Sequence, residues 1–235
     1  MKKTIIILLT LITALITPPA FAVNQVLSLD GDGDYVEIKD SESLNPINSQ
    51  VTMEAWIKAT KFANDWMPII YKGDERTPNF SNRSYTLWLG NLGQLHLASA
   101  TSGKGRMYLN SPNGSIKFNI WYHVAGVIDV KNSVMSIFIN GTEVARQPFG
   151  EDIHISKLPL RIGWTHEEDS TYSPFAGQID EVRIWNVART AEQIRETMFK
   201  KLTGGEGGLA GLWDFDSGDA RDSTANGYDG ELFGD

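Results

Sequence analysis

The chain has 235 residues, a net charge of −8 and no cysteine. Its acidic excess and the absence of a Lys/Arg cluster argue against a nucleic-acid-binding protein, because neutralising phosphates requires grouped basic side chains. Without cysteine the chain has no disulfide, thiolate nucleophile or thiolate metal site, so a folded domain must be held by its core, alone or with an oxygen-bound metal ion.

The first 22 residues have the features of a secretory signal peptide. Two lysines precede an apolar run over residues 4–17, and Ala20-Phe21-Ala22 forms an A-x-A cleavage site. A membrane-spanning helix needs about 20 apolar residues, whereas two prolines interrupt this run. We therefore expect cleavage after residue 22, no membrane span in the mature chain, and a secreted or periplasmic protein with a single domain over residues 23–235.

Most of the chain shows the period-2 alternation of β-strands. At residues 51–58, Val51, Met53, Ala55 and Ile57 fall on one face and the intervening residues on the other. Gly- and Asn-rich turns separate the strands; among them, Asn140-Gly141 is typical of a type I′ hairpin. The pattern predicts an all-β, antiparallel two-sheet sandwich. It also covers residues 26–29, 35–38, 85–89, 94–100, 121–129, 135–140, 158–164 and 178–186.

One short helix is predicted near the C-terminal end. Thr190 and Gln193 have the spacing of a capping box, and Ile194 and Met198 lie one turn apart on an apolar stripe. After a Gly-rich stretch the chain continues with alternating aromatic residues. We therefore expect residues 209–235 to dock on the sandwich as a C-terminal segment.

Six segments in a fixed order carry a family resemblance: LSLDGDGDYVEI, VTMEAWIK, NIWYHVAGVID, MSIFINGTEVA, LRIGW and PFAGQIDEVRIWNVARTAEQI. Together they resemble the laminin-G-like members of the concanavalin A-like lectin/glucanase jelly rolls, including the pentraxin-related bacterial domains. The resemblance extends over nearly all of the chain after the leader. It implies a jelly roll of two antiparallel sheets that serves as a binding module.

Residues 29–38, LDGDGDYVEI, place three aspartates at alternate positions. They do not form an EF-hand loop, because the glycine and the glutamate that such a loop needs at its sixth and twelfth positions are missing. The resemblance instead implies a structural Ca²⁺ held between this loop and the aspartate of the G-x-I-D-E-V strand, with Asp30, Asp32 and Asp180 as ligands. The alternative is a polar turn in which the aspartates bind their own backbone.

The sequence gives little support for catalysis. Retaining glycosidases need two carboxyl groups about 5 to 5.5 Å apart, whereas Asp180 and Glu181 are adjacent and are expected on opposite faces of their strand. There is no G-x-S-x-G nucleophile elbow. His166 and the acidic residues 167–169 share one loop, for which a solvated surface is favoured over a metal or catalytic cluster. We predict a non-catalytic protein, with a divergent hydrolase as the least favoured alternative.

Aromatic residues in loops point to ligand binding, because sugar faces stack on flat rings. Trp66, Trp164 and Tyr172 are the candidate platforms, and anchoring of the loops or the core is the alternative. We predict an exported module that recognises a glycan or an extracellular protein surface. A structural or adhesion protein without a sugar site is the alternative, and homo-oligomerisation would raise the avidity of such a module.

Overall fold

The computed structural model describes residues 24–46, 49–62, 66–75, 82–101, 105–150 and 152–234. The predicted signal peptide lies outside these residues. Within the described ranges, no helix has the length and apolar character needed to cross a membrane.

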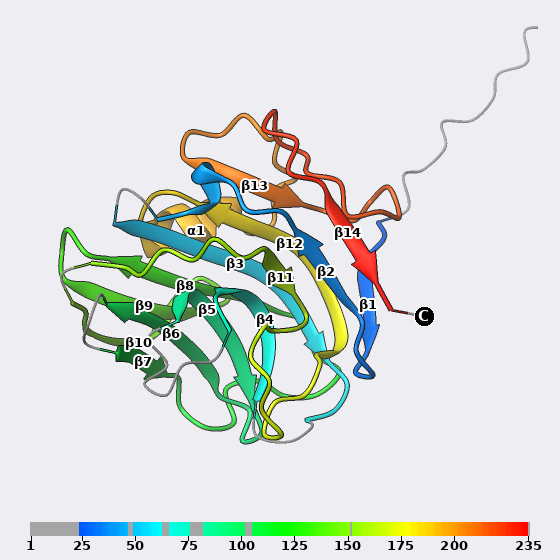
Figure 1. The fold of residues 1–235 in the computed structure, drawn as a ribbon, viewed down its shortest axis with the longest axis horizontal. Coiled ribbons are helices and arrows are strands. Elements are labelled where there is room, and N and C mark those ends of the chain that lie inside the picture. The colour runs from blue at the N-terminus through cyan, green and yellow to red at the C-terminus, as the bar shows by residue number, and fades with distance from the viewer. Residues whose placement is uncertain are drawn as a thin grey trace, which may run out of the picture.

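The predicted all-β jelly-roll sandwich is confirmed. Two seven-stranded antiparallel sheets, named sheet A and sheet B here, make up the fold (Figure 1). Sheet A has the spatial order β1 (Leu27–Asp30), β12 (Ala176–Trp185), β3 (Gln50–Ala59), β8 (Tyr122–Asp129), β9 (Val134–Ile139) and β10 (Thr142–Pro148), with β13 (Leu209–Trp213) also paired with β12. Sheet B has the order β14 (Gly230–Phe233), β2 (Tyr35–Ile38), β11 (Leu160–Ile162), β4 (Trp66–Gly73), β5 (Arg83–Gly90), β6 (Leu95–Thr101) and β7 (Gly105–Asn110).

Strand β3 shows how the alternating pattern builds the core. Val51, Met53 and Ile57 are buried in the large apolar cluster between the two sheets, as their spacing predicts. The opposite face is also buried at Thr52 and Glu54, which the alternation did not predict. These polar side chains are covered because the segment that leads into the helix packs over them and bonds to them through Arg189.

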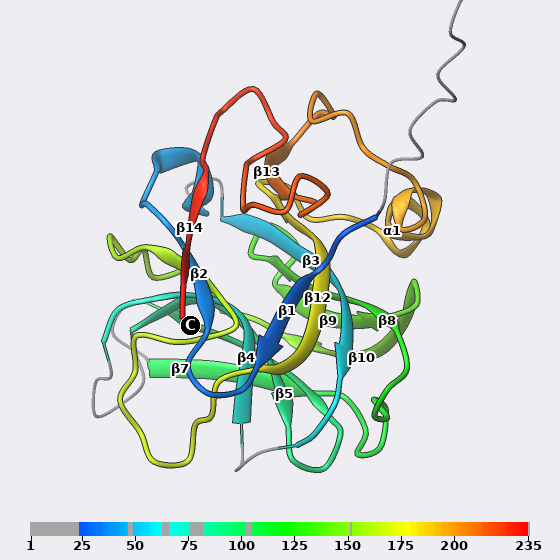
Figure 2. The ribbon, with the colours of Figure 1, turned by 90° about the vertical axis from the view of Figure 1, so that its right-hand side faces the viewer.

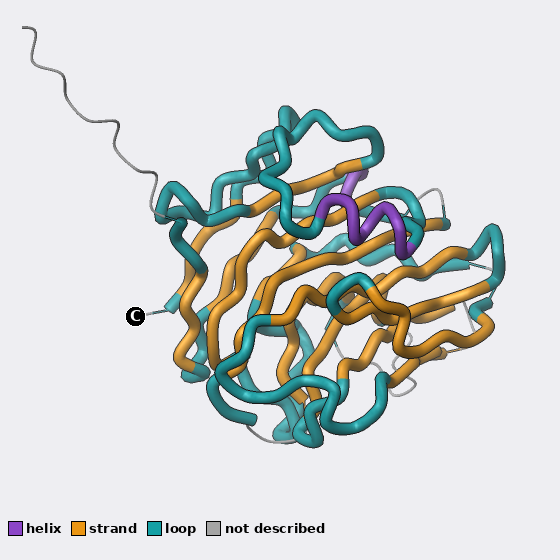
Figure 3. Tube along the Cα trace, turned by 180° about the vertical axis from the view of Figure 1, so that it is seen from behind, coloured by secondary structure: helices purple, strands orange, loops and turns teal. Residues whose placement is uncertain are grey.

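The single α-helix of the described chain, α1 (Ala191–Thr197), begins at the predicted capping box. The Thr190 hydroxyl accepts a hydrogen bond from the Gln193 backbone, and the Gln193 side chain accepts one from the Thr190 backbone. Ile194 is buried against Val127 and Phe138. The neighbours of Val127 on its strand face the core, so Val127 itself faces outward. The helix α1 therefore lies over the outer side of sheet A, as the view from behind shows (Figure 3).

Two strands of sheet B, β4 and β7, were not expected from the sequence. Strand β4 contains a proline, which cannot donate to the sheet and is therefore confined to edges and bulges. Here the register shifts between Pro68 and Ile70, so a bulge accommodates the proline inside the sheet. The Asn140-Gly141 turn forms the predicted hairpin, with φ values of 49° and 73°.

The two ends of the described chain lie beside strands from elsewhere in the sequence. Strand β1 pairs with β12, and β14 pairs with β2 at the edge of sheet B (Figure 2). The Tyr35 and Phe233 rings stack with centroids 4.9 Å apart. A short 3₁₀ helix, η1 (Glu42–Leu44), follows β2.

Candidate binding sites

The three aspartates predicted to bind calcium occupy two separate places. Asp30 ends β1 opposite Ala176, whereas Asp180 lies four residues further along the same partner strand, a separation of about 13 Å at ~3.3 Å per residue. The Asp30 carboxylate accepts a hydrogen bond of 2.7 Å from the Asp32 backbone, as in a polar turn. The described residues contain no group of three acidic or histidine side chains suited to a metal ion. The structure does not bring these three carboxylates together, and calcium binding stays a prediction.

The aromatic candidates meet on the outer side of sheet B. Strand alternation puts Leu87 and Leu89 of β5 in the core and Trp88 on the other face. Trp66 and Tyr172 form a bridge between β4 and the loop that follows β11, and Trp164 packs partly buried against the same cluster. Trp66, Trp88 and Tyr172 border a cavity of about 300 Å³, here called the aromatic pocket, whose lining does not include Trp164. The lining consists of Trp66, Arg83, Trp88, His96, Arg106, Asp169, Thr171 and Tyr172.

A buried ion pair supports the aromatic pocket. Arg83 donates two hydrogen bonds to the Glu167 carboxylate, at 2.6 and 3.1 Å, and a third of 3.0 Å to the Tyr172 hydroxyl. Tyr71 and Asn82 also donate to Glu167, at 3.0 and 3.2 Å. Burial alone would raise the pKa of Glu167, but Arg83 and these donors hold it below its ordinary value. The expectation that the acidic loop is solvated is wrong at this residue, because Glu167 is the buried partner of Arg83.

Trp88 and His96 line the aromatic pocket in addition to the aromatic candidates from the sequence. The indole nitrogen of Trp88 is buried and has no hydrogen-bond partner in the described chain. His96 packs against Trp66 with ring centroids 4.6 Å apart, and its Nδ1 lies 2.7 Å from the side-chain oxygen of Asn110. Burial, and then the charge of Arg83, lowers the pKa of His96 to about 3, so the imidazole is neutral at physiological pH. The pocket thus offers aromatic surfaces beside neutral and paired polar groups.

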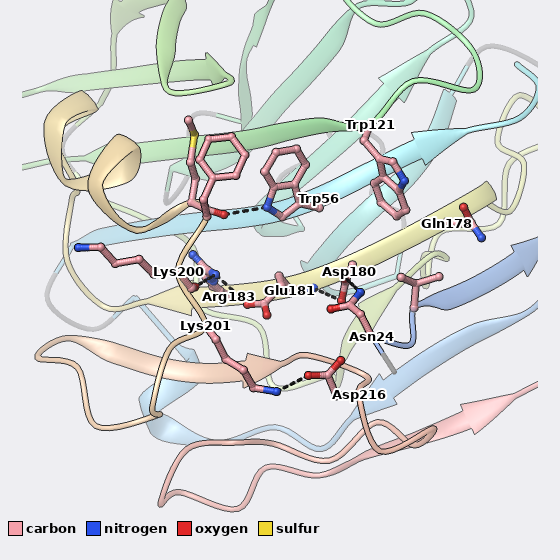
Figure 4. A pocket seen from close by; sticks show the side chains of 13 residues that line it. Asn24, Trp56, Trp121, Gln178, Asp180, Glu181, Arg183, Lys200, Lys201 and Asp216 are labelled. Carbon is pink, nitrogen blue, oxygen red and sulfur yellow. Dashed lines mark hydrogen bonds and ion pairs between the residues drawn. The ribbon is translucent and has the colours of Figure 1, made fainter. Parts of the chain in front are cut away.

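A larger cavity of about 620 Å³, here called the α1 pocket, lies on the outer side of sheet A (Figure 4). Trp56 of β3 forms part of its wall, and its indole nitrogen donates a 2.9 Å hydrogen bond to the carbonyl of Met198 at the end of α1. Phe199 lies 5.3 Å from the Trp56 ring and is 76% exposed. Trp121, which precedes β8, lines the same cavity and is partly exposed.

A β-bulge places two adjacent carboxylates in the α1 pocket. The register between β12 and β3 shifts between Asp180 and Arg183, and Glu181 adopts a φ of 51°, in the left-handed region. Asp180 and Glu181 therefore line the same cavity. The expectation that they lie on opposite faces of the strand is wrong, because the bulge interrupts the alternation there.

The carboxylates of the α1 pocket differ in their partners. Glu181 accepts a 2.7 Å hydrogen bond from Arg183, and Asp216 pairs with Lys201. Among the described residues, Asp180 accepts hydrogen bonds only from the Asn24 amide, at 3.2 Å, and the Glu181 backbone, at 2.8 Å. Burial, with smaller contributions from the charges of Glu181 and Asp216, raises the pKa of Asp180 to about 6.

Sequence comparison assigns the chain to a family. A family model for the concanavalin A-like lectin/glucanases superfamily matches residues 30–195, which is more than half of the chain. The chain therefore belongs to this superfamily, in agreement with the resemblance noted above. A search of curated proteins gave no match.

Solved structures share the fold. A candidate carbohydrate-binding protein from Bacteroides ovatus is 25% identical, with a TM-score of 0.65 over 87% of this chain and 57% of that protein, so this chain spans little more than half of its length. The CBM40 domain of the Ruminococcus gnavus IT-sialidase, bound to α2,3-sialyllactose, is 17% identical, with a TM-score of 0.59 over 73% of this chain and 95% of that domain. A leech intramolecular trans-sialidase is 18% identical, with a TM-score of 0.56 over 74% of this chain and 28% of that enzyme.

Proposed function

We propose that this chain is a non-catalytic glycan-binding module and that the aromatic pocket is its binding site. The observation that carries the proposal is the convergence of Trp66, Trp88 and Tyr172 on one cavity that also contains charged groups. A sugar presents an apolar face that stacks on an aromatic ring and hydroxyls that bond to fixed polar groups. The pocket supplies both kinds of contact.

The polar groups of the aromatic pocket are held in place before any ligand arrives. Arg83 and Tyr172 line the pocket and are hydrogen-bonded to each other. Arg83 is held by the buried Glu167, which the surrounding hydroxyl and amide donors fix in turn. A pre-organised site loses less conformational entropy on binding. The same ion pair disfavours catalysis by Glu167, because a general acid needs a raised pKa, whereas the pKa of Glu167 is lowered.

The comparisons support the glycan-binding proposal. The Bacteroides ovatus protein, at 25% identity, is a candidate carbohydrate-binding protein. The CBM40 domain, whose likeness supports only the fold, binds sialyllactose in its own structure. As part of the proposal, the predicted signal peptide would carry the module to a secreted or periplasmic location.

A glycan array probed with residues 23–235 tests this function. We expect binding to at least one glycan class, and titration calorimetry of the strongest glycan should show an affinity at least about tenfold lower for Trp66→Ala, equivalent to about 1.4 kcal/mol. Phe118→Ala is the control, because it removes an exposed aromatic ring that lines neither cavity and should keep the parent affinity. An array without binding, or an unchanged affinity for Trp66→Ala, would contradict the proposal.

A further inference from the structure

The α1 pocket is separate from the aromatic pocket. Trp56 lies between two core residues on β3, so its side chain projects from the outer side of sheet A. Trp88 projects in the same way from the outer side of sheet B. Because the two sheets pack face to face, the cavities open on opposite sides of the sandwich, and none of the described residues lines both.

The aromatic wall of the α1 pocket is held in a fixed orientation. The Trp56 ring is anchored by its hydrogen bond to Met198 and by an edge contact with His123, with ring centroids 5.5 Å apart. Phe199, the most exposed of the large apolar side chains in the described ranges, extends this wall. Figure 4 shows Trp56 and Trp121 along one side of the pocket and the carboxylates along the other. This arrangement offers flat apolar surfaces opposite hydrogen-bond acceptors.

The acceptors of the α1 pocket have capacity for a ligand. No cation pairs with Asp180 in the described chain, and its donors are only amides. Asp216 pairs with Lys201 through one oxygen, while its other oxygen is buried without a hydrogen-bond partner in that part of the chain. Hydrogen bonds from hydroxyls to carboxylates are charge-assisted and stronger than neutral ones.

The bulge in β12 directs these acceptors into the cavity at the cost of backbone strain. A non-glycine residue in the left-handed region, such as Glu181, is energetically unfavourable and is concentrated at functional sites. β-Bulges are over-represented beside such sites because they redirect side chains. The strained backbone at Glu181 is therefore explained by the bulge, which directs the carboxylates into the pocket.

We propose that the α1 pocket is a second saccharide-binding site, which takes a neutral sugar residue by stacking on Trp121 or Phe199 and by hydroxyl hydrogen bonds to Asp180 and Asp216. A neutral ligand is favoured over an ion because Arg183, Lys200 and Lys201 balance the three carboxylates of the lining. Stacking on a ring with carboxylate acceptors at the edge matches a hexose, which has an apolar face and vicinal hydroxyls.

Two sites on opposite faces would let one monomer bridge two glycan chains. Packed sheets lie about 10 Å apart, and both pockets face away from that core, so a single short glycan cannot reach both. The bridging role rests on the proposed function of the aromatic pocket, whereas the second site does not depend on it.

The test uses the intact chain after residue 22 and four named sugars: glucose, galactose, mannose and N-acetylglucosamine. Saturation-transfer NMR identifies which of them binds, and titration calorimetry measures the affinity for the parent, Asp180→Asn, Trp121→Ala and Trp66→Ala. We expect at least one sugar to lose about tenfold or more in affinity with Asp180→Asn and Trp121→Ala while Trp66→Ala leaves it unchanged. Asp180→Asn keeps the side-chain size and an acceptor oxygen, and unchanged melting would show that folding is intact.

The outcomes separate the two sites. Binding that only Trp66→Ala weakens would overturn the second site and leave the proposed function standing, whereas binding that only the α1 pocket variants weaken would do the reverse. If none of the four sugars binds, the second site is overturned. It is also overturned if the parent hydrolyses a disaccharide and Asp180→Asn abolishes that hydrolysis, because the pocket would then be catalytic.

Bridging has its own test, the precipitation of a multivalent glycoprotein. Precipitation by the parent, but by neither Trp66→Ala nor Asp180→Asn, would establish bridging. Precipitation that survives either substitution would refute it.

Discussion

The two pockets differ in how their carboxylates are satisfied. Beside the aromatic pocket, the buried Glu167 is surrounded by Arg83 and neutral donors, and its pKa lies below the ordinary value. In the α1 pocket, the donors to Asp180 from the described part of the chain are only amides, and its pKa rises to about 6. A carboxylate held by a cation fixes the shape of a site, whereas one without a cation keeps its capacity to accept from a ligand. The comparison assigns a supporting role to Glu167 and a contacting role to Asp180.

The strongest test of this difference removes the supporting carboxylate. Glu167→Ala leaves the buried Arg83 without its counter-ion, and loss of one partner of a buried ion pair costs about 3–5 kcal/mol. We expect urea unfolding to show a loss of this size in the free energy of unfolding. Glu168→Ala, at an exposed neighbouring carboxylate, is the control and should change the stability by less than about 0.5 kcal/mol. Equal stability of the two variants would show that Glu167 does not support the fold.

A smaller effect is expected from the pH dependence of Asp180. Its pKa is raised from 3.8 to about 6 in the folded chain, so the folded state holds this proton more tightly than the unfolded state. Its contribution to stability is therefore full below about pH 4 and is lost as the pH rises to about 6. Each pKa unit corresponds to about 1.4 kcal/mol, and solvent screening reduces the loss to about 1–2 kcal/mol.

Asp180→Asn should remove that pH dependence. Urea unfolding at pH 4, 5, 6 and 7 in EDTA, compared with the parent, measures the difference, and Asp32→Asn at an exposed carboxylate is the control. The same slope in the parent and in Asp180→Asn would show that another group titrates in this range.

The smallest effect concerns calcium. Asp30 and Asp180 lie about 13 Å apart along β12, whereas calcium ligands lie within about 2.3–2.6 Å of the ion. We therefore expect that no calcium-induced rise in melting temperature is abolished by both Asp30→Ala and Asp180→Ala. Melting in EDTA and in millimolar calcium measures this. A calcium-induced rise that each substitution abolishes would restore the shared site predicted from the sequence.

The fold could be predicted because its signals are local. Alternation at residues 51–58, the Asn140-Gly141 turn and the Thr190 capping box each appear in the structure as expected. Strand β4 was missed because Pro68 is unfavourable in a strand and is accommodated only by a bulge, whose position depends on the neighbouring strand.

The candidate site could be predicted only in part, because its support is non-local. The sequence predicts Trp66 and Tyr172 as loop aromatics, and they meet in one pocket, although Trp66 begins strand β4. The alternation of residues 85–89 already places Trp88 on the face opposite the core, a signal that could have identified it. Nothing local pairs Glu167 with Arg83, which is 84 residues away, or predicts the bulge that brings Asp180 and Glu181 together. Such features arise from tertiary packing.

The most direct test of the central claim is to locate the bound glycan by NMR. The chain has seven tryptophans, and their indole N–H signals can be assigned by single Trp→Phe substitutions. Titration with the strongest glycan from the array should shift the Trp88 and Trp66 signals, because both rings line the aromatic pocket, and should leave the core residue Trp213 unchanged. A titration in which neither the Trp66 nor the Trp88 signal moves would contradict the claim that the aromatic pocket binds glycans.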